Sequence, residues 1–336
     1  MAARNPLPDL PHTNHDLAMA LRRQLQQRRE LLASAVARSP EMKIMQLLQE
    51  VDSALGRMDV GRYGVCDVCQ EAVEEDRLLS DPLVRVCLCE LNSTQQGALE
   101  KDLELAARIQ ARLLPQKDFR CDGWQVAYQY RPLSVVSGDY CDLMIGPDES
   151  LYFLLGDVAG KGVAASVLMS NLSAIFRALI PLGLPLNELM ERANRIFTGS
   201  TLPNQYATLI CGRAKTCGEL ELCNAGHVSA LVVAGEEVSE VGSSGMPIGL
   251  FSEEKFSVAE LQLAPDSSLV LFTDGVSEAR REDEDYGYER IAAAVVRGAG
   301  LCTSEAVANV LGDLDEFLSH TPVYDDQTLM LLQRCA

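Results

Sequence analysis

The first third of the chain places apolar side chains at the spacing of α-helices. From His15 to about Ala37, leucines recur along one helix face. They are Leu17, Leu21, Leu25 and Leu31 or Leu32. Ser39-Pro40 interrupts this pattern, and a second stripe then runs to about Met58. It consists of Met42, Met45, Leu47, Leu48, Val51 and Leu55. The two stripes predict an antiparallel helical hairpin over residues 1–60.

A third helical stripe precedes Pro115, which ends it. Its apolar positions recur at three and four residues: Leu99, Leu103, Ala106, Ile109 and Leu113. This spacing predicts a connector helix within residues 93–116. One apolar face on such a helix indicates either core contact within the chain or pairing with its twin in a homodimer. The stripe alone does not choose between them.

From about Phe119 the pattern changes to short β-prone runs separated by turns, with helices between some of them. The expected strands are WQVAYQY, DYCDLMI, LYFLLGDV, YATLICGR, ELELCNAG, VSALVVA, SLVLFTDG and QTLMLLQ. Helices are expected near residues 162–180, 187–198, 288–297 and 304–319. Many strands at hairpin spacing with interspersed helices predict an α+β fold with antiparallel sheets over residues 117–336.

Composition narrows the class of protein. Hydrophobic residues make up 47% of the 336 residues, and the formal net charge is −19. This charge argues against direct nucleic-acid binding, because surfaces that grip phosphate backbones concentrate Lys and Arg. The N-terminus lacks the pattern of a secretory signal, and we count no run of the roughly 18 apolar residues that a membrane span needs. Eleven cysteines without an export signal fit a reducing compartment. We therefore expect a cytoplasmic protein that does not enter a membrane.

Residues 61–92 carry the most local cysteine pattern. Cys66 and Cys69 form a CxxC pair, and after seventeen residues Cys87 and Cys89 form a CxC pair. Four thiolates on two knuckles suit one tetrahedral zinc ion, which would supply folding free energy that so short a segment lacks. The segment resembles the zinc finger of the DksA/TraR family, whose second pair is spaced CxxC. The resemblance implies a structural or sensory zinc ribbon.

Four aspartates stand in distinctive settings: Asp139 in SGDYCD, Asp157 in LLGDVAGKG, Asp274 in FTDG and Asp325 in YDDQT. Three of them lie at or near the end of an apolar, β-prone run, where a strand delivers a side chain to an open loop. Carboxylates of this kind suit hard divalent cations, which take oxygen ligands and retain several waters. The sequence therefore predicts a Mn²⁺ or Mg²⁺ site.

Eight motifs in order extend this prediction: ARIQARLLP, SGDYCD, GDVAGKG, YATL, NAGH, GMPIGL, TDGVSEAR and DDQTLMLL. Together they resemble the SpoIIE-type branch of the PPM family of metal-dependent protein phosphatases. The resemblance implies two packed antiparallel sheets flanked by helices and two Mn²⁺ or Mg²⁺ ions at one edge.

The resemblance also implies a role for each matched residue. Asp157 bridges the two ions and the backbone oxygen of Val158 completes one of them. Asp274 and Asp325 hold the other ion, in preference to Asp326, and Asp139 contacts the pair directly or through water. Two further residues are substrate-binding candidates, Lys161 in the Gly-Lys-Gly turn and His227 in NAGH; either also fits a structural role. The stretch after Asp157 lacks the histidine of eukaryotic members, which leaves the general acid unassigned.

The implied function is hydrolysis of a phosphoserine or phosphothreonine protein by metal-activated water, with a STAS-type anti-sigma-factor antagonist as the expected substrate. One alternative is a regulatory or scaffold protein that binds partners through the ribbon and helices and has a vestigial phosphatase domain. The four retained aspartates argue against it. Phosphodiester cleavage could use the same carboxylates, but the acidic balance offers no nucleic-acid groove.

Overall fold

The computed structural model describes residues 15–39, 42–88, 93–202 and 205–335. The chain forms two compact units. The first contains Met1–Leu105 together with Gly160–Val163, and the second contains Ala106–Ala159 and Ala164–Ala336. The boundary falls inside helix α4 (Ser93–Ala111), so this helix belongs to both units.

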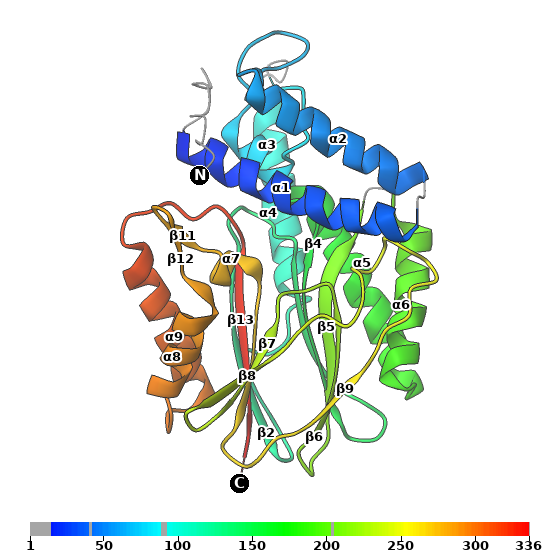
Figure 1. Cartoon of the computed structure of the whole chain (residues 1–336), viewed down its shortest axis with the longest axis vertical. Coiled ribbons are helices and arrows are strands. Elements are labelled where there is room, and N and C mark those ends of the chain that lie inside the picture. The colour runs from blue at the N-terminus through cyan, green and yellow to red at the C-terminus, as the bar shows by residue number, and fades with distance from the viewer. Residues whose placement is uncertain (1–14, 40–41, 89–92, 203–204, 336) are drawn as a thin grey trace. The chain divides into compact units, whose positions relative to one another are not determined.

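The first unit begins with the predicted helical hairpin, α1 (His15–Arg38) and α2 (Met42–Asp59). Arg22 near the start of α1 pairs with Asp59 at the end of α2 at 2.5 Å, and Arg29 pairs with Asp52 further along at 2.5 Å. Ion pairs in this reversed order require antiparallel helices, which confirms the hairpin (Figure 1).

The buried face of α2 differs from the predicted one. Met42 and Met45 are 76% and 51% exposed, whereas Ile44 is buried. The buried residues of this helix are Ile44, Leu47, Val51, Ala54 and Met58. These residues alternate at spacings of three and four, so they form one continuous helix face. Met42 and Met45 lie outside that face.

The connector helix α4 also departs from its predicted stripe. Ile109 of that stripe is 55% exposed, while the polar Gln110 outside it is buried. The amide of Gln110 explains its burial, because it donates to the backbone oxygen of Ser137 (2.6 Å) and accepts from the backbone N–H of Ser137 (3.1 Å). A hydrogen-bonded pair of this kind allows a polar side chain to be buried.

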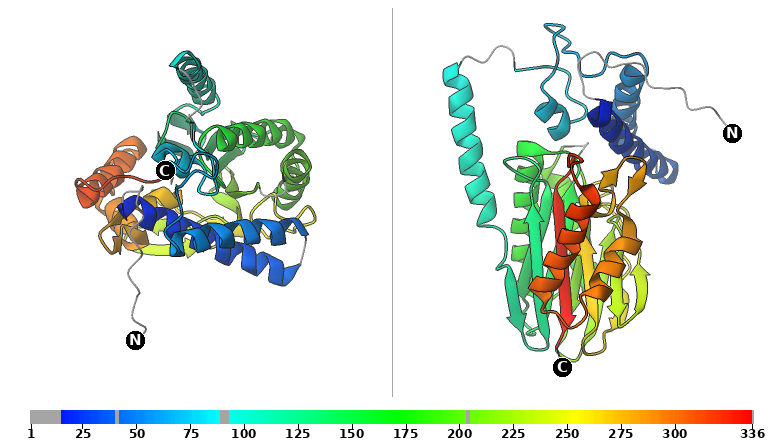
Figure 2. Two further views of the ribbon diagram at one scale, coloured as in Figure 1. Left: turned by 90° about the horizontal axis from the view of Figure 1, so that it is seen from above. Right: turned by 90° about the vertical axis from the view of Figure 1, so that its left-hand side faces the viewer.

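The second unit contains two antiparallel sheets packed face to face (Figures 1 and 2). The six-stranded sheet has the order β1 (Asp118–Cys121), β2 (Trp124–Arg131), β13 (Gln327–Arg334), β10 (Ser268–Phe272), β7 (Ala230–Ala234), β8 (Glu237–Val241). The five-stranded sheet has the order β3 (Asp139–Ile145), β4 (Leu151–Val158), β5 (Ala207–Ala214), β6 (Glu219–Ala225), β9 (Ala259–Gln262). This arrangement confirms the predicted α+β sandwich.

Helices cover the outer face of each sheet. Helices α5 (Gly162–Leu179) and α6 (Leu186–Ser200) share a core with the five-stranded sheet. Helices α8 (Gly287–Arg297) and α9 (Thr303–Leu318) share one with the six-stranded sheet. A third core fills the space between the two sheets. The shorter elements, α3 (Glu75–Ser80), α7 (Asp274–Ser277), β11 (Arg280–Arg281) and β12 (Glu284–Asp285), and the strands β1, β8 and β9 were not predicted.

The segment Gly162–Leu182 is long and apolar enough to cross a membrane by length and composition, with a mean hydropathy of 1.7. Our count of uninterrupted apolar residues did not detect it, because Arg177 and Pro181 break the run. Its apolar residues include Met169, Leu172 and Phe176, which are fully buried in the core beneath the five-stranded sheet. A core helix of this kind meets the same criterion without a membrane, so the segment is weak evidence for a span.

Candidate functional site

The alternation of side chains along β3 and β4 brings two of the predicted aspartates together. On β4, Phe153 and Leu155 face the core between the sheets, and Asp157 continues the same alternation at the end of the strand. On β3, Cys141 faces that core, and Asp139 precedes it by two residues. Asp139 and Asp157 are also directly opposite each other in the antiparallel register, which places their Cβ atoms about 5 Å apart.

Two threonines of the other sheet hold the carboxylate of Asp139. Thr273, which follows β10, donates its hydroxyl to Asp139 Oδ2 at 3.2 Å, and Thr328 of β13 donates to the same oxygen. The two threonines also bond to each other, because the backbone N–H of Thr328 donates to Thr273 Oγ1 at 3.0 Å. These bonds link the ends of the two sheets at Asp139, which is buried.

Asp274 and Asp325 enter from the six-stranded sheet. Asp274 is the first residue of α7, directly after Thr273. Gly275 allows the start of α7 to approach the segment before β13 closely, because a Cβ at this position would lie 1.9 Å from the backbone oxygen of Asp326. Only glycine fits there, which accounts for the TDG motif. The geometry therefore brings Asp274 next to the Asp325-Asp326 pair that precedes β13.

The two adjacent aspartates have different surroundings. Asp326 is buried and accepts backbone N–H groups from Leu133 (2.6 Å) and Gly138 (3.1 Å), one on each carboxylate oxygen. It thereby joins the two ends of the loop that leads to Asp139. Asp325 Oδ1 accepts the backbone N–H of Asp326 at 2.8 Å. Asp326 thus has a structural role in this loop, and the assignment of Asp325 as the ligand stays a prediction.

Burial and mutual repulsion shift the pKa values of these carboxylates upward. Burial raises the pKa of Asp157 well above its usual range, and repulsion from Asp274 and Asp139 adds to the shift. Burial likewise raises the pKa of Asp139, and the charges of Asp326 and Asp325 contribute further. Within the described part of the chain, no three of these carboxylates converge to within 4.8 Å as the cysteines below do. Ligands spread over two ions need not all converge on one point.

Three other residues were singled out by sequence. Val158 ends β4, next to Asp157, and Lys161 lies in the short segment Gly160–Val163 that groups with the first unit. His227 is buried and both ring nitrogens have partners, Thr208 Oγ1 at 2.8 Å and the backbone oxygen of Phe272 at 3.2 Å. Neither nitrogen is left to bind a phosphate, so these contacts favour the structural role of His227.

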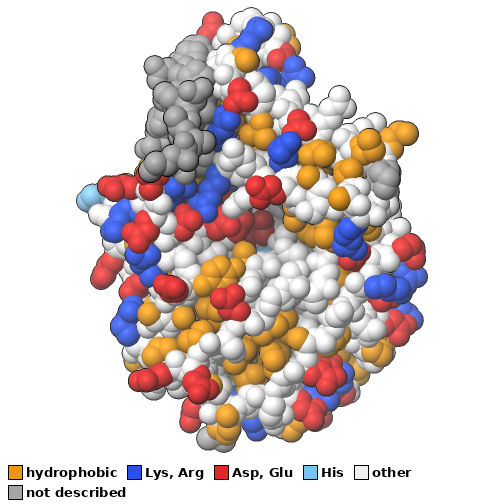
Figure 3. Space-filling view, viewed as in Figure 1, with side chains coloured by type: hydrophobic (Ala, Val, Ile, Leu, Met, Phe, Trp, Pro, Cys, Tyr) orange, Lys and Arg blue, Asp and Glu red, His pale blue; other side chains and the backbone are white. Residues whose placement is uncertain are grey.

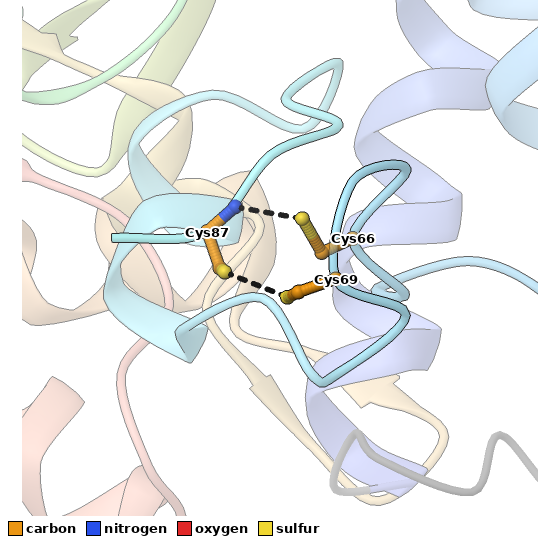
Figure 4. Close-up of side chains that lie close together, drawn as sticks. All are labelled: Cys66, Cys69 and Cys87. Atoms are coloured by element: carbon orange, nitrogen blue, oxygen red, sulfur yellow. Dashed lines mark hydrogen bonds between the residues drawn. The ribbon is translucent and has the colours of Figure 1, made fainter. Parts of the chain in front are cut away.

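Three of the four predicted zinc ligands form the second cluster (Figure 4). Cys66, Cys69 and Cys87 bring their sulfur atoms within 4.8 Å of one another. Cys69 Sγ lies 3.3 Å from Cys87 Sγ. Cys66 Sγ accepts backbone N–H groups from Val68 (3.4 Å) and Cys87 (3.3 Å), as Figure 4 shows for the second. The backbone N–H groups around Cys66 lower the pKa of its thiol to about 6. Cys89 lies outside the described residues.

The ribbon around these cysteines is closed by polar contacts. Arg85 pairs with Asp67 at 2.6 Å, which links the segments that carry the two knuckles. Tyr63 donates its hydroxyl to the backbone oxygen of Pro82 at 2.8 Å. Gln70 follows the first knuckle with a φ of 63°, the left-handed conformation that turns the chain back after a CxxC pair. The cysteine knuckles thus form within a defined fold of the first unit.

Sequence reasoning missed Thr273, Thr328 and Thr208. Each lies in or next to a motif that we had singled out, TDG, DDQT or YATL. No periodicity indicates that the two threonines of the six-stranded sheet meet Asp139, because this contact joins residues more than one hundred positions apart. Their hydroxyls at fixed offsets from the aspartates were the only available signal.

Charged side chains of both signs lie mainly toward the edges of the second unit's face in Figure 3, with acidic ones frequent among them, while hydrophobic and uncharged side chains fill much of its centre. This distribution agrees with the net charge of −19. It offers no continuous basic surface on the face shown.

Comparisons with known proteins show which family this chain matches. The family model described as Stage II sporulation protein E (SpoIIE) matches residues 147–335. Protein IcfG of Synechocystis is 24% identical over 270 residues, which cover 71% of this chain and 42% of IcfG. Phosphoserine phosphatase RsbU of Bacillus subtilis is 24% identical over 245 residues, which cover 71% of this chain and 72% of RsbU. The chain therefore spans less than half of the length of IcfG.

Solved structures address the fold. The SiaA-PP2C domain of Pseudomonas aeruginosa superposes with a TM-score of 0.62 at 21% identity, covering 73% of this chain and 100% of that domain. At this identity the likeness supports the two-sheet fold alone. Because the family model matches more than half of the residues, the chain belongs to the SpoIIE family.

Proposed function

We propose that this chain is a metal-dependent phosphoprotein phosphatase that hydrolyses phosphoserine or phosphothreonine in a protein substrate. The observation that carries the proposal is the gathering of Asp139, Asp157, Asp274 and Asp325 from both sheets at one end of the core between them. The mutual effect of these carboxylates on the pKa of Asp157 and Asp139 supports their proximity. A cluster of buried like charges fits a pair of divalent cations.

In this proposal the four aspartates and the backbone oxygen of Val158 would hold two Mn²⁺ or Mg²⁺ ions. Such ions supply Lewis acidity when bound, which neutralises phosphate charge and lowers the pKa of water. The protein contributes orientation: Thr273 and Thr328 fix Asp139 by its Oδ2 atom. Asp326 fixes the loop before Asp139 through two backbone N–H groups. Lys161 stays a candidate for contact with phosphate.

The proposed substrate is a serine-phosphorylated anti-sigma-factor antagonist of the STAS type. Its support is the likeness to RsbU, a phosphoserine phosphatase, over most of both chains. The chain would then act in a partner-switching pathway that controls transcription.

Activity assays on the whole chain test the proposal. We expect release of phosphate from p-nitrophenyl phosphate and from a phosphoserine protein in the presence of Mn²⁺, and loss of this release in EDTA. The kcat of the Asp157→Ala variant should fall at least about 100-fold, because removal of a single preorganised electrostatic group from a catalytic site lowers kcat by about this much. Equal rates for the variant and the wild type would exclude the assigned centre.

We propose in addition that Cys66, Cys69 and Cys87, together with Cys89, bind one structural zinc ion. The lowered pKa of Cys66 favours the thiolate at neutral pH, which is the form that ligates zinc. The three backbone N–H groups that surround this sulfur support the same state. Assignment of the ribbon to the DksA/TraR type rests on the sequence motif.

Metal analysis of protein purified under reducing conditions should find about one zinc per chain. Cys66→Ser should lose this zinc and loosen the first unit without loss of Mn²⁺ binding. Cys217→Ser provides the matched control, because Cys217 is an exposed free cysteine in the second unit. Absence of zinc in the wild type, or equal zinc in both variants, would contradict the assignment.

A homodimer through α4 completes the proposal. Leu105 and Ile109 are one helical turn apart on this helix and both are exposed, which is the spacing of a helix-pairing face. Light scattering coupled to size-exclusion chromatography should report twice the chain mass, and Ile109→Lys should shift it toward the monomer. A wild-type monomer would remove this part of the proposal.

A further inference from the structure

His227 lies in the crossover that takes the chain from one sheet to the other. Strand β6 of the five-stranded sheet ends at Ala225, and strand β7 of the six-stranded sheet begins at Ala230. The imidazole of His227 is buried between them, 5% exposed. Its Nδ1 atom meets Thr208 of β5, and its Nε2 atom meets the backbone oxygen of Phe272 of β10. One side chain therefore contacts both sheets.

The partners determine which nitrogen carries the proton. The backbone oxygen of Phe272 can only accept, so Nε2–H must donate to it. Burial lowers the pKa of His227 to about 4, so the ring is neutral at pH 7 and Nδ1 is an acceptor. Thr208 must then donate its hydroxyl proton to Nδ1. A hydroxyl has one proton, so the contact of Thr208 Oγ1 with the backbone oxygen of Asp157, at 3.5 Å, is not a second bond.

The contact with Phe272 replaces a missing strand bond. Pairing between β7 and β10 runs through Leu231 opposite Val270, where the described ladder ends. Continuing the register would place Phe272 opposite Ser229, but β7 has not yet begun there. The ring of His227 satisfies the buried carbonyl that this leaves, which a buried backbone group requires.

Both partners of His227 lie next to proposed metal ligands. Thr208 is directly opposite Asp157 in the register of β4 and β5. Phe272 precedes Asp274 by two residues at the end of β10. The path from Thr208 through His227 to Phe272 therefore runs between the strand that carries Asp157 and the strand that delivers Asp274.

We infer that His227 and Thr208 form a positioning pair that sets the separation between Asp157 of one sheet and Asp274 of the other. This inference rests on the proposed two-ion centre. Like-charged carboxylates on different sheets repel each other when no cation lies between them. The bond network of Asp139, Thr273 and Thr328 also ties the sheets together, but it uses a ligand. The pair formed by His227 and Thr208 restrains them without using one.

The test compares Thr208→Val with Thr208→Ser. Valine keeps the shape and removes the hydroxyl donor, whereas serine retains it. Thr198→Val is the matched control, because Thr198 in α6 is also half-buried and its hydroxyl donates to the backbone oxygen of Asn194 at 2.7 Å. Three quantities are measured for each variant: Mn²⁺ binding to the metal-free protein by calorimetry, the Mn²⁺ concentration for half-maximal kcat, and Tm in EDTA.

We expect Thr208→Val to weaken Mn²⁺ binding and to raise the half-maximal Mn²⁺ concentration by about 10-fold, equivalent to about 1.4 kcal/mol, with kcat largely recovered at saturating Mn²⁺. Thr208→Ser should restore the wild-type Mn²⁺ dependence. Thr198→Val should lower Tm and leave Mn²⁺ binding unchanged. His227→Gln, assayed in the same way, should follow Thr208→Val.

Asp157→Ala distinguishes failure of the proposed metal centre from failure of the proposed positioning pair. If it retains activity, the metal centre itself is wrong. If it is inactive but Thr208→Val binds Mn²⁺ as the wild type does, the centre stands and the positioning pair is refuted. Equal losses of Mn²⁺ affinity in Thr208→Val and Thr198→Val would also refute it, because that result would reflect general loosening of the fold.

Discussion

The carboxylate of Asp326 provides a direct test of how the two adjacent aspartates divide their roles. Its two oxygens accept the backbone N–H groups of Leu133 and Gly138 at 2.6 and 3.1 Å. The side chain is buried, with 4% of the residue exposed. We therefore predict that Asp326→Asn lowers the stability of the second unit, while Asp325→Asn impairs metal binding.

The magnitude follows from the bonds lost. Asparagine has one carbonyl oxygen, so one N–H keeps its acceptor and the other faces an NH₂ group. A hydrogen bond to a charged acceptor contributes about 1.5–3 kcal/mol, and a buried N–H left unpaired costs about 1–3 kcal/mol. Loss of the Asp326 charge also relieves its repulsion with Asp139, which acts in the opposite direction. We expect a net loss of about 2–4 kcal/mol, or roughly 4–16 °C in Tm for a unit of this size.

The assay is urea unfolding, followed for both variants in EDTA and in saturating Mn²⁺. Relief of repulsion matters most in EDTA, so the loss in Asp326→Asn should be larger in Mn²⁺. Hydrogen exchange should show faster opening of the amides of Leu133 and Gly138 in this variant alone. Asp325→Asn should unfold in EDTA at nearly the wild-type urea concentration and lose most activity. Wild-type stability combined with lost Mn²⁺ binding in Asp326→Asn would refute the reasoning.

Three further predictions follow from single contacts. Gly275→Ala should destabilise the second unit by at least about 3 kcal/mol in thermal unfolding, because its Cβ would lie 1.9 Å from the backbone oxygen of Asp326; a soluble variant with wild-type Tm would contradict the close approach. Arg177→Met should cost about 2–4 kcal/mol in urea unfolding, because it leaves the buried carboxylate of Asp142 without its partner at 2.8 Å. This loss lies near the lower end of the range for broken buried ion pairs, since Arg177 is 44% exposed. Adding Asp142→Asn should recover part of the loss. The folded-state pKa of His227, about 4, lies below its ordinary 6.5, so the unfolded chain binds the proton first as the pH falls. The unfolding free energy should therefore fall by up to about 3 kcal/mol as pH drops from 6.5 to 4. His227→Gln should lack this pH-dependent loss of stability, and parallel pH profiles for the two proteins would exclude the assignment of the loss to His227.

Part of the site could be predicted from the sequence because it depends on local patterns. Apolar runs that end in Asp157 and Asp274 identify strands that deliver carboxylates to an edge, and the period of two indicates which side chains share a face. The large leucines of α1 likewise mark its buried face, since Leu17, Leu21, Leu25 and Leu32 are all buried. Where side-chain size and spacing disagreed, as at Met42 and Ile44, the prediction was wrong.

The rest depended on which segments pair. Asp142 illustrates the limit: it stands three residues from Asp139, but it is buried on the other face of β3, where Arg177 of α5 pairs with it. The spacing of three within a strand places the two carboxylates on opposite faces. Once the strand boundaries are known this assignment is simple, but the motif SGDYCD alone does not give the face that each side chain occupies.

The sequence by itself determined the family, the predicted α+β architecture and the residue types available for a metal centre, because these properties follow from motifs and local periodicity. Only the tertiary structure decided that Asp139 lies opposite Asp157, that threonines from the other sheet hold Asp139, and that Asp326 supports a loop. Strand register and contacts between distant segments are set by the packing of the two sheets, and no local pattern encodes them.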